Sequence, residues 1–269
     1  MNISRDTRLC MSLSGRPGNF GTRFHNYLYQ ALELDYLYKA FTTTNLPAAI
    51  GGIRALGVRG CAVSMPFKEA CIEHLDGLDA SAATLQSVNT IVADDGRLTG
   101  YNTDYSAVVK LLAQHGVPPS SHYALRGSGG MAKAVGCALR DSGFAQGCIV
   151  ARNEQAGRAL ASECGVDWQA QLSERPAQLL INVTPLGMQG SDADQLAFDA
   201  NAVAAAEWVF DVVAVPVETP LIRLARSLGK PIITGGEVIV LQAVEQFVLY
   251  TGVRPDAALI ERAARHALS

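Results

Sequence analysis

Two short segments pair a charged side chain with the expected end of a strand. In the first, Ser64-Met65-Pro66-Phe67-Lys68-Glu69, an apolar run stops at the proline and a helix begins. In the second, Asn102-Thr103-Asp104 opens a helical pattern. Side chains at strand ends point into the crevice where α/β proteins bind ligands. An amine there can transfer a proton or bind an anion. Each segment also fits a plainer reading, with Lys68 a solvated lysine at a helix start and Asp104 or Thr103 a helix N-cap.

A glycine-rich turn provides a third signal. The segment Gly127-Ser128-Gly129-Gly130-Met131-Ala132 reads G-x-G-x-x-A, follows an apolar strand directly and opens a helix. Backbone without Cβ atoms lets a pyrophosphate approach the amides at the helix N-terminus. In this context the pattern predicts a dinucleotide-binding turn. The alternative is an ordinary glycine turn between a strand and a helix.

The end of the next strand bears on the choice of dinucleotide. An acidic residue there accepts the 2′-hydroxyl of NAD, whereas an arginine accommodates the 2′-phosphate of NADP. The chain has Ala151-Arg152-Asn153, with no acid before Glu154. This favours NADP over NAD. An exposed arginine at a strand end is the alternative reading of Arg152.

The elements that position these residues alternate between β-like runs and helical patterns along the whole chain. Such alternation predicts α/β layers with a largely parallel sheet. The expected strands are Leu9 to Leu13, Tyr36 to Phe41, Gly60 to Ser64, Tyr123 to Leu125, Gly147 to Ala151, Leu179 to Val183, Trp208 to Val213 and Pro231 to Thr234, with a hairpin formed by Val88 to Val92 and Leu98 to Tyr101. Helical patterns run from Glu237 to Tyr250 and from Pro255 to Ala267.

Composition limits the class of protein. With 269 residues, nearly half of them apolar, and a net charge of −3, the chain is expected to be a globular protein without a nucleic-acid partner. It contains no long apolar run, and Arg5, Asp6 and Arg8 stand where a signal peptide would be apolar, so a cytoplasmic protein with no membrane partner is expected. The six cysteines form no C-x-x-C pair, which favours reduced, buried thiols.

The order of these and other motifs resembles the shikimate dehydrogenase family over essentially the whole chain, and most closely its shikimate dehydrogenase-like branch. The motifs are Ser12-Leu13-Ser14 with His25-Asn26, Pro66-Phe67-Lys68-Glu69, Ser87-Val88-Asn89-Thr90, Tyr101-Asn102-Thr103-Asp104, the glycine turn, Asn182-Val183-Thr184-Pro185-Leu186-Gly187-Met188 and Gln242-Ala243.

The resemblance implies a fold and an activity. An N-terminal α/β substrate domain (1–103) would precede an NADP-binding Rossmann domain (104–235), and C-terminal helices (236–269) would pack back on the first domain. The expected reaction interconverts shikimate, or a related hydroxylated ring carboxylate, and its 3-dehydro ketone in the chorismate pathway of aromatic amino acid biosynthesis. NADP is the expected cofactor, with no metal, and the protein is expected to be a monomer or homodimer.

The resemblance also implies roles for individual residues. Lys68 and Asp104 would form the catalytic pair. The substrate would be bound by Ser12, Ser14, Ser64, Asn89 and Gln242. The cofactor would be bound by Gly127, Ser128, Gly129, Gly130, Met131, Ala132, Arg152, Asn153, Val212 and Gly235. For His25, a capping or packing role is favoured over the alternative of a contact with substrate.

The chain departs from the family pattern at several positions. Ala62 replaces an asparagine, Ser64 a threonine and Ala214 a tyrosine near the expected substrate site. Ala107 replaces a glycine, and Ala156 a second phosphate-binding arginine, although Arg158 is nearby. These changes leave open a quinate-type or amino-substituted substrate, use of NAD, or a cofactor-binding regulatory protein with little turnover.

Overall fold

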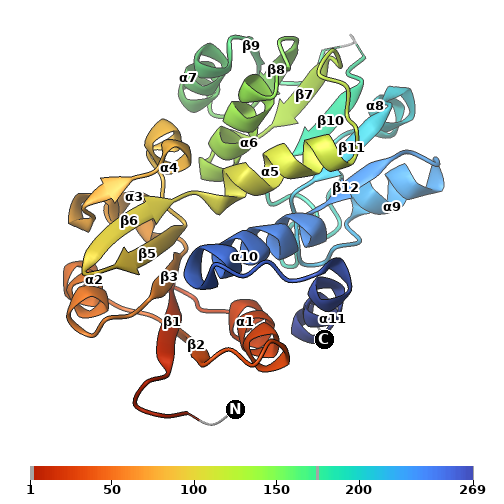
Figure 1. Ribbon diagram of the computed structural model, residues 1–269. Coiled ribbons are helices and arrows are strands. Elements are labelled where there is room, and N and C mark those ends of the chain that lie inside the picture. Colours follow the sequence, from red (N-terminus) through yellow and green to blue (C-terminus); the bar gives the residue numbers. More distant parts are fainter. Residues whose placement is uncertain (1–2, 174–175, 269) are drawn as a thin grey trace. The chain divides into compact units, whose positions relative to one another are not determined.

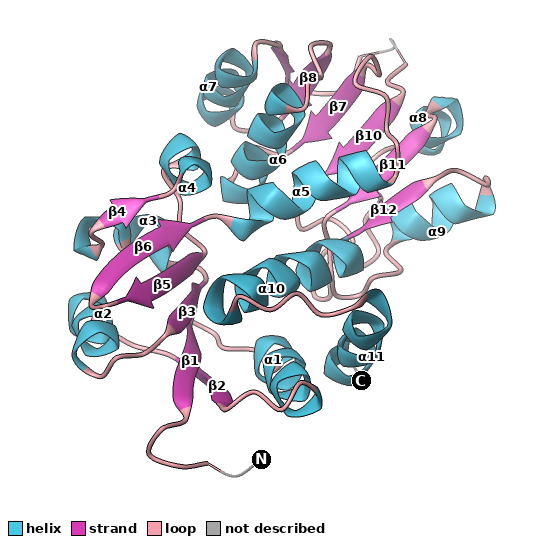
Figure 2. Cartoon of the chain, in the orientation of Figure 1, coloured by secondary structure: helices cyan, strands magenta, loops and turns pink. Residues whose placement is uncertain are grey.

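The computed structural model describes residues 3–173 and 176–268. The chain divides into two compact units, one made of residues 1–103 with 240–269 and the other of residues 104–239. The chain passes between the units within α5 (Thr103–Gln114) and again within α10 (Gly235–Thr251). Each unit contains one six-stranded sheet with helices packed against it (Figures 1 and 2).

The sheet of the first unit has the strand order β2-β1-β3-β5-β6-β4. These strands are β1 (Arg8–Leu13), β2 (Tyr36–Phe41), β3 (Gly60–Val63), β4 (Gly77–Leu78), β5 (Thr90–Asp94) and β6 (Arg97–Tyr101). The pairs β1–β2 and β1–β3 are parallel, whereas β3–β5 and β5–β6 are antiparallel. The sheet is therefore mixed. The expected hairpin is present, and its turn residues Asp95 and Gly96 both have positive φ, as a two-residue hairpin turn requires.

Helices cover both faces of this sheet. On one face, α1 (Phe20–Ala31), α11 (Ala257–Leu268) and the part of α10 from residue 240 share an apolar core that includes Phe24, Leu28 and Phe247. Figure 1 shows α11 beside α1, and the two helices are in contact. On the other face, α2 (Leu46–Ala55) and α4 (Ala80–Leu85) contribute to a second core, while α3 (Phe67–Ala70) and the short 3-10 helix Ile72–His74 lie between β3 and β4 in the chain. The C-terminal helices thus pack on the N-terminal part of the chain.

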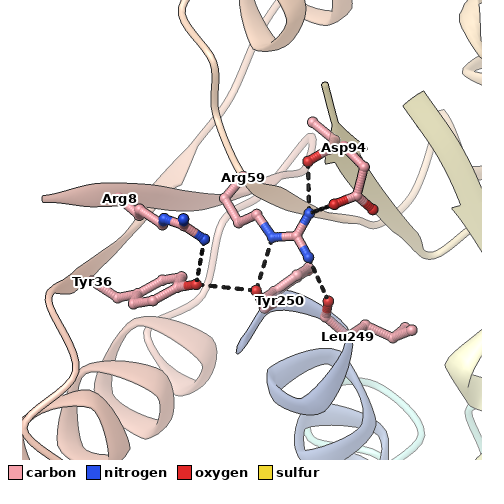
Figure 3. A network of polar contacts seen from close by, with 7 residues as sticks. Arg8, Tyr36, Arg59, Asp94, Leu249 and Tyr250 are labelled. Atoms are coloured by element: carbon pink, nitrogen blue, oxygen red, sulfur yellow. Dashed lines mark hydrogen bonds and ion pairs between the residues drawn. The ribbon is translucent and has the colours of Figure 1, made fainter. Parts of the chain in front are cut away.

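An arginine fixes the C-terminal end of α10 to this sheet (Figure 3). Arg59 donates from Nε to the Tyr250 carbonyl (2.9 Å) and from the guanidinium to the carbonyls of Leu249 (3.3 Å) and Ala93 (2.7 Å), and it pairs with Asp94. A cation that binds the last carbonyls of a helix satisfies acceptors with no partner inside the helix. The helix that carries Gln242 is therefore anchored at its far end.

The sheet of the second unit is wholly parallel, in the order β12-β11-β10-β7-β8-β9. Its strands are β7 (Tyr123–Arg126), β8 (Gly147–Val150), β9 (Asp167–Gln169), β10 (Leu179–Asn182), β11 (Trp208–Asp211) and β12 (Ile232–Thr234). The helices of this unit include α6 (Gly130–Asp141), α7 (Glu154–Cys164), α8 (Ala200–Ala205) and α9 (Pro220–Ser227). The strand order is that of a Rossmann fold, in which ligands bind where the order reverses, here between β7 and β10.

The described residues contain no helix that is long and apolar enough to span a membrane. All six cysteines are buried and unpaired by disulfides, as expected.

Candidate functional site

A cavity of about 460 Å³ lies in the first unit where β1 and β3 end, lined by Ser14, Gly15, Arg16, Ser64, Met65 and Pro66. Backbone hydrogen bonds hold its two walls together. The Ser64 amide donates to the Leu13 carbonyl (3.0 Å), and the Gly15 amide donates to the Met65 carbonyl (3.0 Å). The structure therefore brings Ser14 and Ser64, two predicted substrate-binding residues, to one cavity.

Ser12 and Gln242 lie elsewhere in the same unit. Ser12 is half-buried on β1 and interacts with the Tyr38 phenol. Gln242 lies one turn before Gln246 on α10, so the two side chains share a helix face. Gln246 Nε2 donates to Thr90 Oγ1 (3.0 Å) and to the Asn89 carbonyl (3.3 Å). These bonds hold that face of α10 against the start of β5, next to Asn89.

Asn89 is the most constrained of the predicted substrate residues. Its side chain is buried, and its Oδ1 accepts hydrogen bonds from the Thr103 amide (2.8 Å), Thr103 Oγ1 (3.2 Å) and Thr90 Oγ1 (2.9 Å). Within the described residues, no hydrogen-bond partner reaches the buried Nδ2. A buried donor without a partner costs free energy. This donor is therefore well suited to a substrate hydroxyl.

Lys68 and Asp104 occupy the two segments that the sequence singled out. Lys68 lies in the short helix α3, where its carbonyl accepts the Val88 amide (2.8 Å), so its backbone is bound to the segment that leads into Asn89. Asp104 lies in the first turn of α5 and is 5% exposed. It follows Thr103, the residue that Asn89 binds. Lys68 belongs to the first unit and Asp104 to the second, and their pairing stays a prediction.

The second unit contains a groove of about 500 Å³ at the carboxyl ends of β7, β8 and β10. Its lining includes Arg126, Gly127, Ser128, Arg152, Asn153 and Thr184. Gly127 has a φ of +131°, and a Cβ on it would lie 2.7 Å from Val183 Cγ2. Only glycine fits this position without strain. The turn therefore meets the backbone requirement of a dinucleotide site.

Of the remaining residues of the turn, some leave the backbone accessible and others pack against the protein. A Cβ built on Gly129 or Gly130 would meet nothing within 4 Å, so the backbone at the start of α6 is open to a ligand. Ala132 is fully buried, and Met131 is half-buried. A small third residue lets the helix pack closely on the strand. The turn thus has the shape that a pyrophosphate requires.

The residues after β8 have distinct neighbours. Arg152 is exposed and lines the groove. Asn153 also lines the groove, and its Oδ1 accepts the Ala156 amide (3.0 Å) as the N-cap of α7. Arg158 does not line the groove: its Nε donates to Glu154 Oε1 (2.8 Å), and its guanidinium lies 4.5 Å from the centre of the Trp168 ring. Arg158 is therefore engaged elsewhere.

Val212 and Gly235, both predicted to line the nicotinamide, are neighbours. A Cβ on Gly235 would lie 2.5 Å from the Val212 carbonyl oxygen and 2.2 Å from that of Val213. Gly235 starts α10, where Thr234 and Glu237 cap each other: Glu237 Oε2 accepts the Thr234 amide (2.8 Å), and Thr234 Oγ1 accepts the Glu237 amide (3.3 Å). The close packing of Gly235 and the capping box thus fix the start of α10 beside Val212.

A buried carboxyl orders the loop beside it. Asp211, at the end of β11, accepts hydrogen bonds from Asn182 Nδ2 (3.0 Å), the Val213 amide (3.1 Å) and Thr219 Oγ1 (2.7 Å). Burial raises the pKa of Asp211 to about 6, although the three hydrogen bonds act in the opposite direction. The position of Val212 therefore depends on Asp211.

Comparison with known proteins shows which family has this architecture. Residues 20–91 match the model of the shikimate dehydrogenase substrate binding domain. A shikimate dehydrogenase-like protein of Haemophilus influenzae is 53% identical over 266 residues, which cover 98% of each chain. The chain belongs to the shikimate dehydrogenase family. Among solved structures, a shikimate 5-dehydrogenase-like protein superposes with a TM-score of 0.98 at 53% identity, covering 100% of both chains. Shikimate 5-dehydrogenase of Thermus thermophilus, in complex with NADP(H) and shikimate, gives a TM-score of 0.86 at 31% identity, covering 96% of this chain and 99% of that one.

The structure also identifies two arginines to which sequence reasoning gave no role in this member of the shikimate dehydrogenase family. Arg16 lines the cavity beside Ser14 and Ser64, and Arg126 lines the groove beside Gly127. Arg16 lies two residues after Ser14 and Arg126 directly precedes Gly127, so each is close to a motif that the sequence had already singled out, and this was the available signal. His25, by contrast, is fully buried and stacks on Tyr38 with ring centres 4.4 Å apart, which agrees with a packing role.

No group of three or more histidine, cysteine, aspartate or glutamate side chains suited to a metal ion occurs in the described part of the chain.

Proposed function

We propose that this protein is an NADP-dependent oxidoreductase that interconverts shikimate, or a closely related hydroxylated ring carboxylate, and its 3-dehydro ketone. The buried Asn89 Nδ2, a donor without a partner among the described residues, carries the proposal. In this scheme residues 1–103 bind substrate, residues 104–235 bind NADP, and residues 236–269 complete the first domain. Family membership and the open backbone at Gly129 and Gly130 support the assignment.

Substrate recognition begins with charge and hydrogen bonds. Ser14 and Ser64 can donate hydroxyl hydrogen bonds to a carboxylate, and Arg16 provides a cation at the same cavity. Ser12 adds a further hydroxyl, while Asn89 Nδ2 and the Gln242 amide bind ring hydroxyls. Together these groups select a small acid with hydroxyls on a rigid ring, because only such a molecule uses all of them.

The bound nicotinamide supplies the hydride acceptor, and the protein aligns the substrate with it. Lys68 takes the proton from the reacting hydroxyl during oxidation and returns it during reduction. Asp104 positions Lys68 and helps to bind the reacting hydroxyl. The Gly127–Ala132 turn binds the pyrophosphate, and Arg152 and Asn153 bind the adenosine end. Val212 and Gly235 border the nicotinamide.

One observation favours a relative of shikimate as the true substrate. Ala62 pairs with Thr90 in the sheet, beside Asn89, at the position where the family has an asparagine. The methyl group offers no hydrogen bond, and Ala214 likewise lacks the hydroxyl of the tyrosine that it replaces. The loss of one such bond costs about 0.5–1.5 kcal/mol. A quinate-type or amino-substituted ring acid is therefore the second candidate.

A steady-state panel tests the proposal. Shikimate, quinate and an amino-substituted analogue are each assayed with NADP and with NAD. The proposal expects the highest kcat/KM with NADP and a shikimate-like acid. A higher value for quinate with NAD would favour the second candidate, whereas tight NADP binding without turnover of any ring acid would indicate a regulatory protein.

A further inference from the structure

Arg126 occupies an unusual position for a cation. It is the last residue of β7 and directly precedes Gly127. Because side chains alternate along a strand, Arg126 lies on the same sheet face as Ala124, which belongs to an apolar core with Phe198. The Arg126 guanidinium lies 5.2 Å from the centre of the Phe198 ring. A guanidinium stacked on an aromatic ring is held in a defined orientation.

Part of this side chain is left without a partner. In the described residues no acceptor binds the buried Nε of Arg126. Burial lowers the pKa of Arg126, nearby Asp199 raises it, and the positive charge of Arg152 lowers it. Both guanidinium groups belong to residues that line one groove, and like charges so placed disfavour each other. A bound anion would relieve this repulsion and supply the missing acceptor.

Two arginines therefore meet at one groove. Arg126 comes from β7 and Arg152 from the end of β8, the neighbouring strand. The groove also contains one acid among its described lining residues, Asp192, whose Oδ1 accepts a hydrogen bond from Gln195 Nε2 (3.0 Å). An anion with two negative charges would satisfy both guanidinium groups, which match phosphate oxygens well.

The other nearby arginine, Arg158, does not line the groove. It pairs with Glu154 and lies over Trp168, whose Nε1 donates to the Ala151 carbonyl (3.0 Å). The family pattern has its second phosphate-binding arginine at the position of Ala156. In this chain the second positively charged residue of the groove is instead Arg126, at the end of β7.

We propose that Arg126 acts with Arg152 to bind the phosphate monoester on the adenosine ribose of NADP(H), and is thus a determinant of cofactor specificity. The inference rests on the proposed NADP-dependent function. Arg126, at the end of the strand before the glycine turn, thus shares the phosphate-binding role of Arg152, which follows β8. Phe198 holds the guanidinium in place, and the phosphate supplies the missing acceptor.

Calorimetric titration with two probes tests the inference: 2′,5′-ADP, which has the extra phosphate, and 5′-AMP, which lacks it. In Arg126→Met the affinity for 2′,5′-ADP should fall by at least about tenfold, the scale of a lost charge-assisted hydrogen bond, with the affinity for 5′-AMP within about twofold of wild type. Arg152→Met should behave alike, and Arg158→Met, the matched control, should keep the wild-type preference. Because each ratio is measured on one protein sample, partial misfolding does not imitate the result.

Three outcomes would overturn the inference. Equal losses for both probes in Arg126→Met would assign Arg126 to structure alone. Unchanged binding in Arg126→Met, together with a loss in Arg152→Met, would leave NADP as cofactor and remove Arg126 from its recognition. A wild-type protein without any preference for 2′,5′-ADP would instead contradict the NADP assignment itself, so the two failures are distinguishable.

Discussion

Asn89 accepts the backbone amide of Thr103 through its side-chain oxygen at 2.8 Å. The bond joins the start of β5 to the first residue of α5, immediately before Asp104. It also turns the amide group of Asn89 so that Nδ2 remains a donor with no partner in the described chain. One side chain thus both fixes the start of α5 and presents a hydrogen-bond donor.

Two substitutions separate these roles of Asn89. Asn89→Asp keeps the accepting oxygen but removes the donor and adds negative charge, so KM for the ring acid should rise by at least about tenfold. Asn89→Ala also strands the buried Thr103 amide and should lower the free energy of unfolding by about 1–3 kcal/mol. Enzyme kinetics and urea unfolding measure the two effects. A wild-type KM in Asn89→Asp would show that Nδ2 does not bind substrate.

The glycine turn allows a similar separation. Gly127→Ala places a Cβ 2.7 Å from Val183 Cγ2 at a φ of +131° and should destabilise the protein by about 1–3 kcal/mol. Gly129→Ala meets no protein atom within 4 Å, so stability should stay within about 0.5 kcal/mol while the Kd for NADP rises at least about tenfold. Thermal unfolding and NADP titration distinguish the variants. Wild-type NADP affinity in Gly129→Ala would place the pyrophosphate elsewhere.

Asp211 should make stability depend on pH. Its pKa is about 6 in the folded protein against an ordinary value of 3.8. Between these values the folded state binds more protons than the unfolded state, so the free energy of unfolding should fall as pH rises from about 4 to 6. The full difference corresponds to about 3 kcal/mol. Asp211→Asn should remove this slope from urea unfolding curves, and an identical slope in both proteins would contradict the assignment.

Arg16 is expected to contribute to carboxylate binding from the rim of its cavity. Because the side chain is exposed, Arg16→Ala should raise KM for the ring acid by only about fivefold and leave kcat unchanged. Arg5→Ala is a matched control, since Arg5 is an exposed arginine of the same unit that pairs with Asp6 (3.6 Å) and does not line the cavity. Equal KM values for the two variants would remove Arg16 from substrate recognition.

Patterns within short stretches of sequence predicted much of the fold. Five of the six strands of the second unit were predicted from their apolar runs, as was the hairpin of β5 and β6, whereas the helices α8 and α9 were not predicted. Strands of two or three residues, such as β4 and β9, are too short to show a periodic pattern of apolar residues. The largely parallel character held for the second sheet, whereas antiparallel pairing of β5 with its neighbours makes the first sheet mixed.

Contacts between distant residues were beyond prediction from local patterns. Gln246 donates hydrogen bonds to Asn89 and Thr90, which precede it by more than 150 residues in the sequence. Arg126 lies over the ring of Phe198, which belongs to a distant segment of the second unit. No local feature of the sequence distinguishes Gln246 from other helical glutamines. Arg158 is a similar case: the sequence shows that it lies near Ala156, but not that its side chain contacts Glu154 and Trp168.

The turnover of Lys68→Ala with NADP and shikimate, or with the best ring acid of the panel, tests the central claim most directly. Loss of a general acid–base should lower kcat by about 100-fold or more, with KM and the Kd for NADP within about threefold of wild type. Lys39→Ala, which removes an exposed lysine of the same unit, serves as control and should keep full activity. A wild-type kcat in Lys68→Ala would contradict the account.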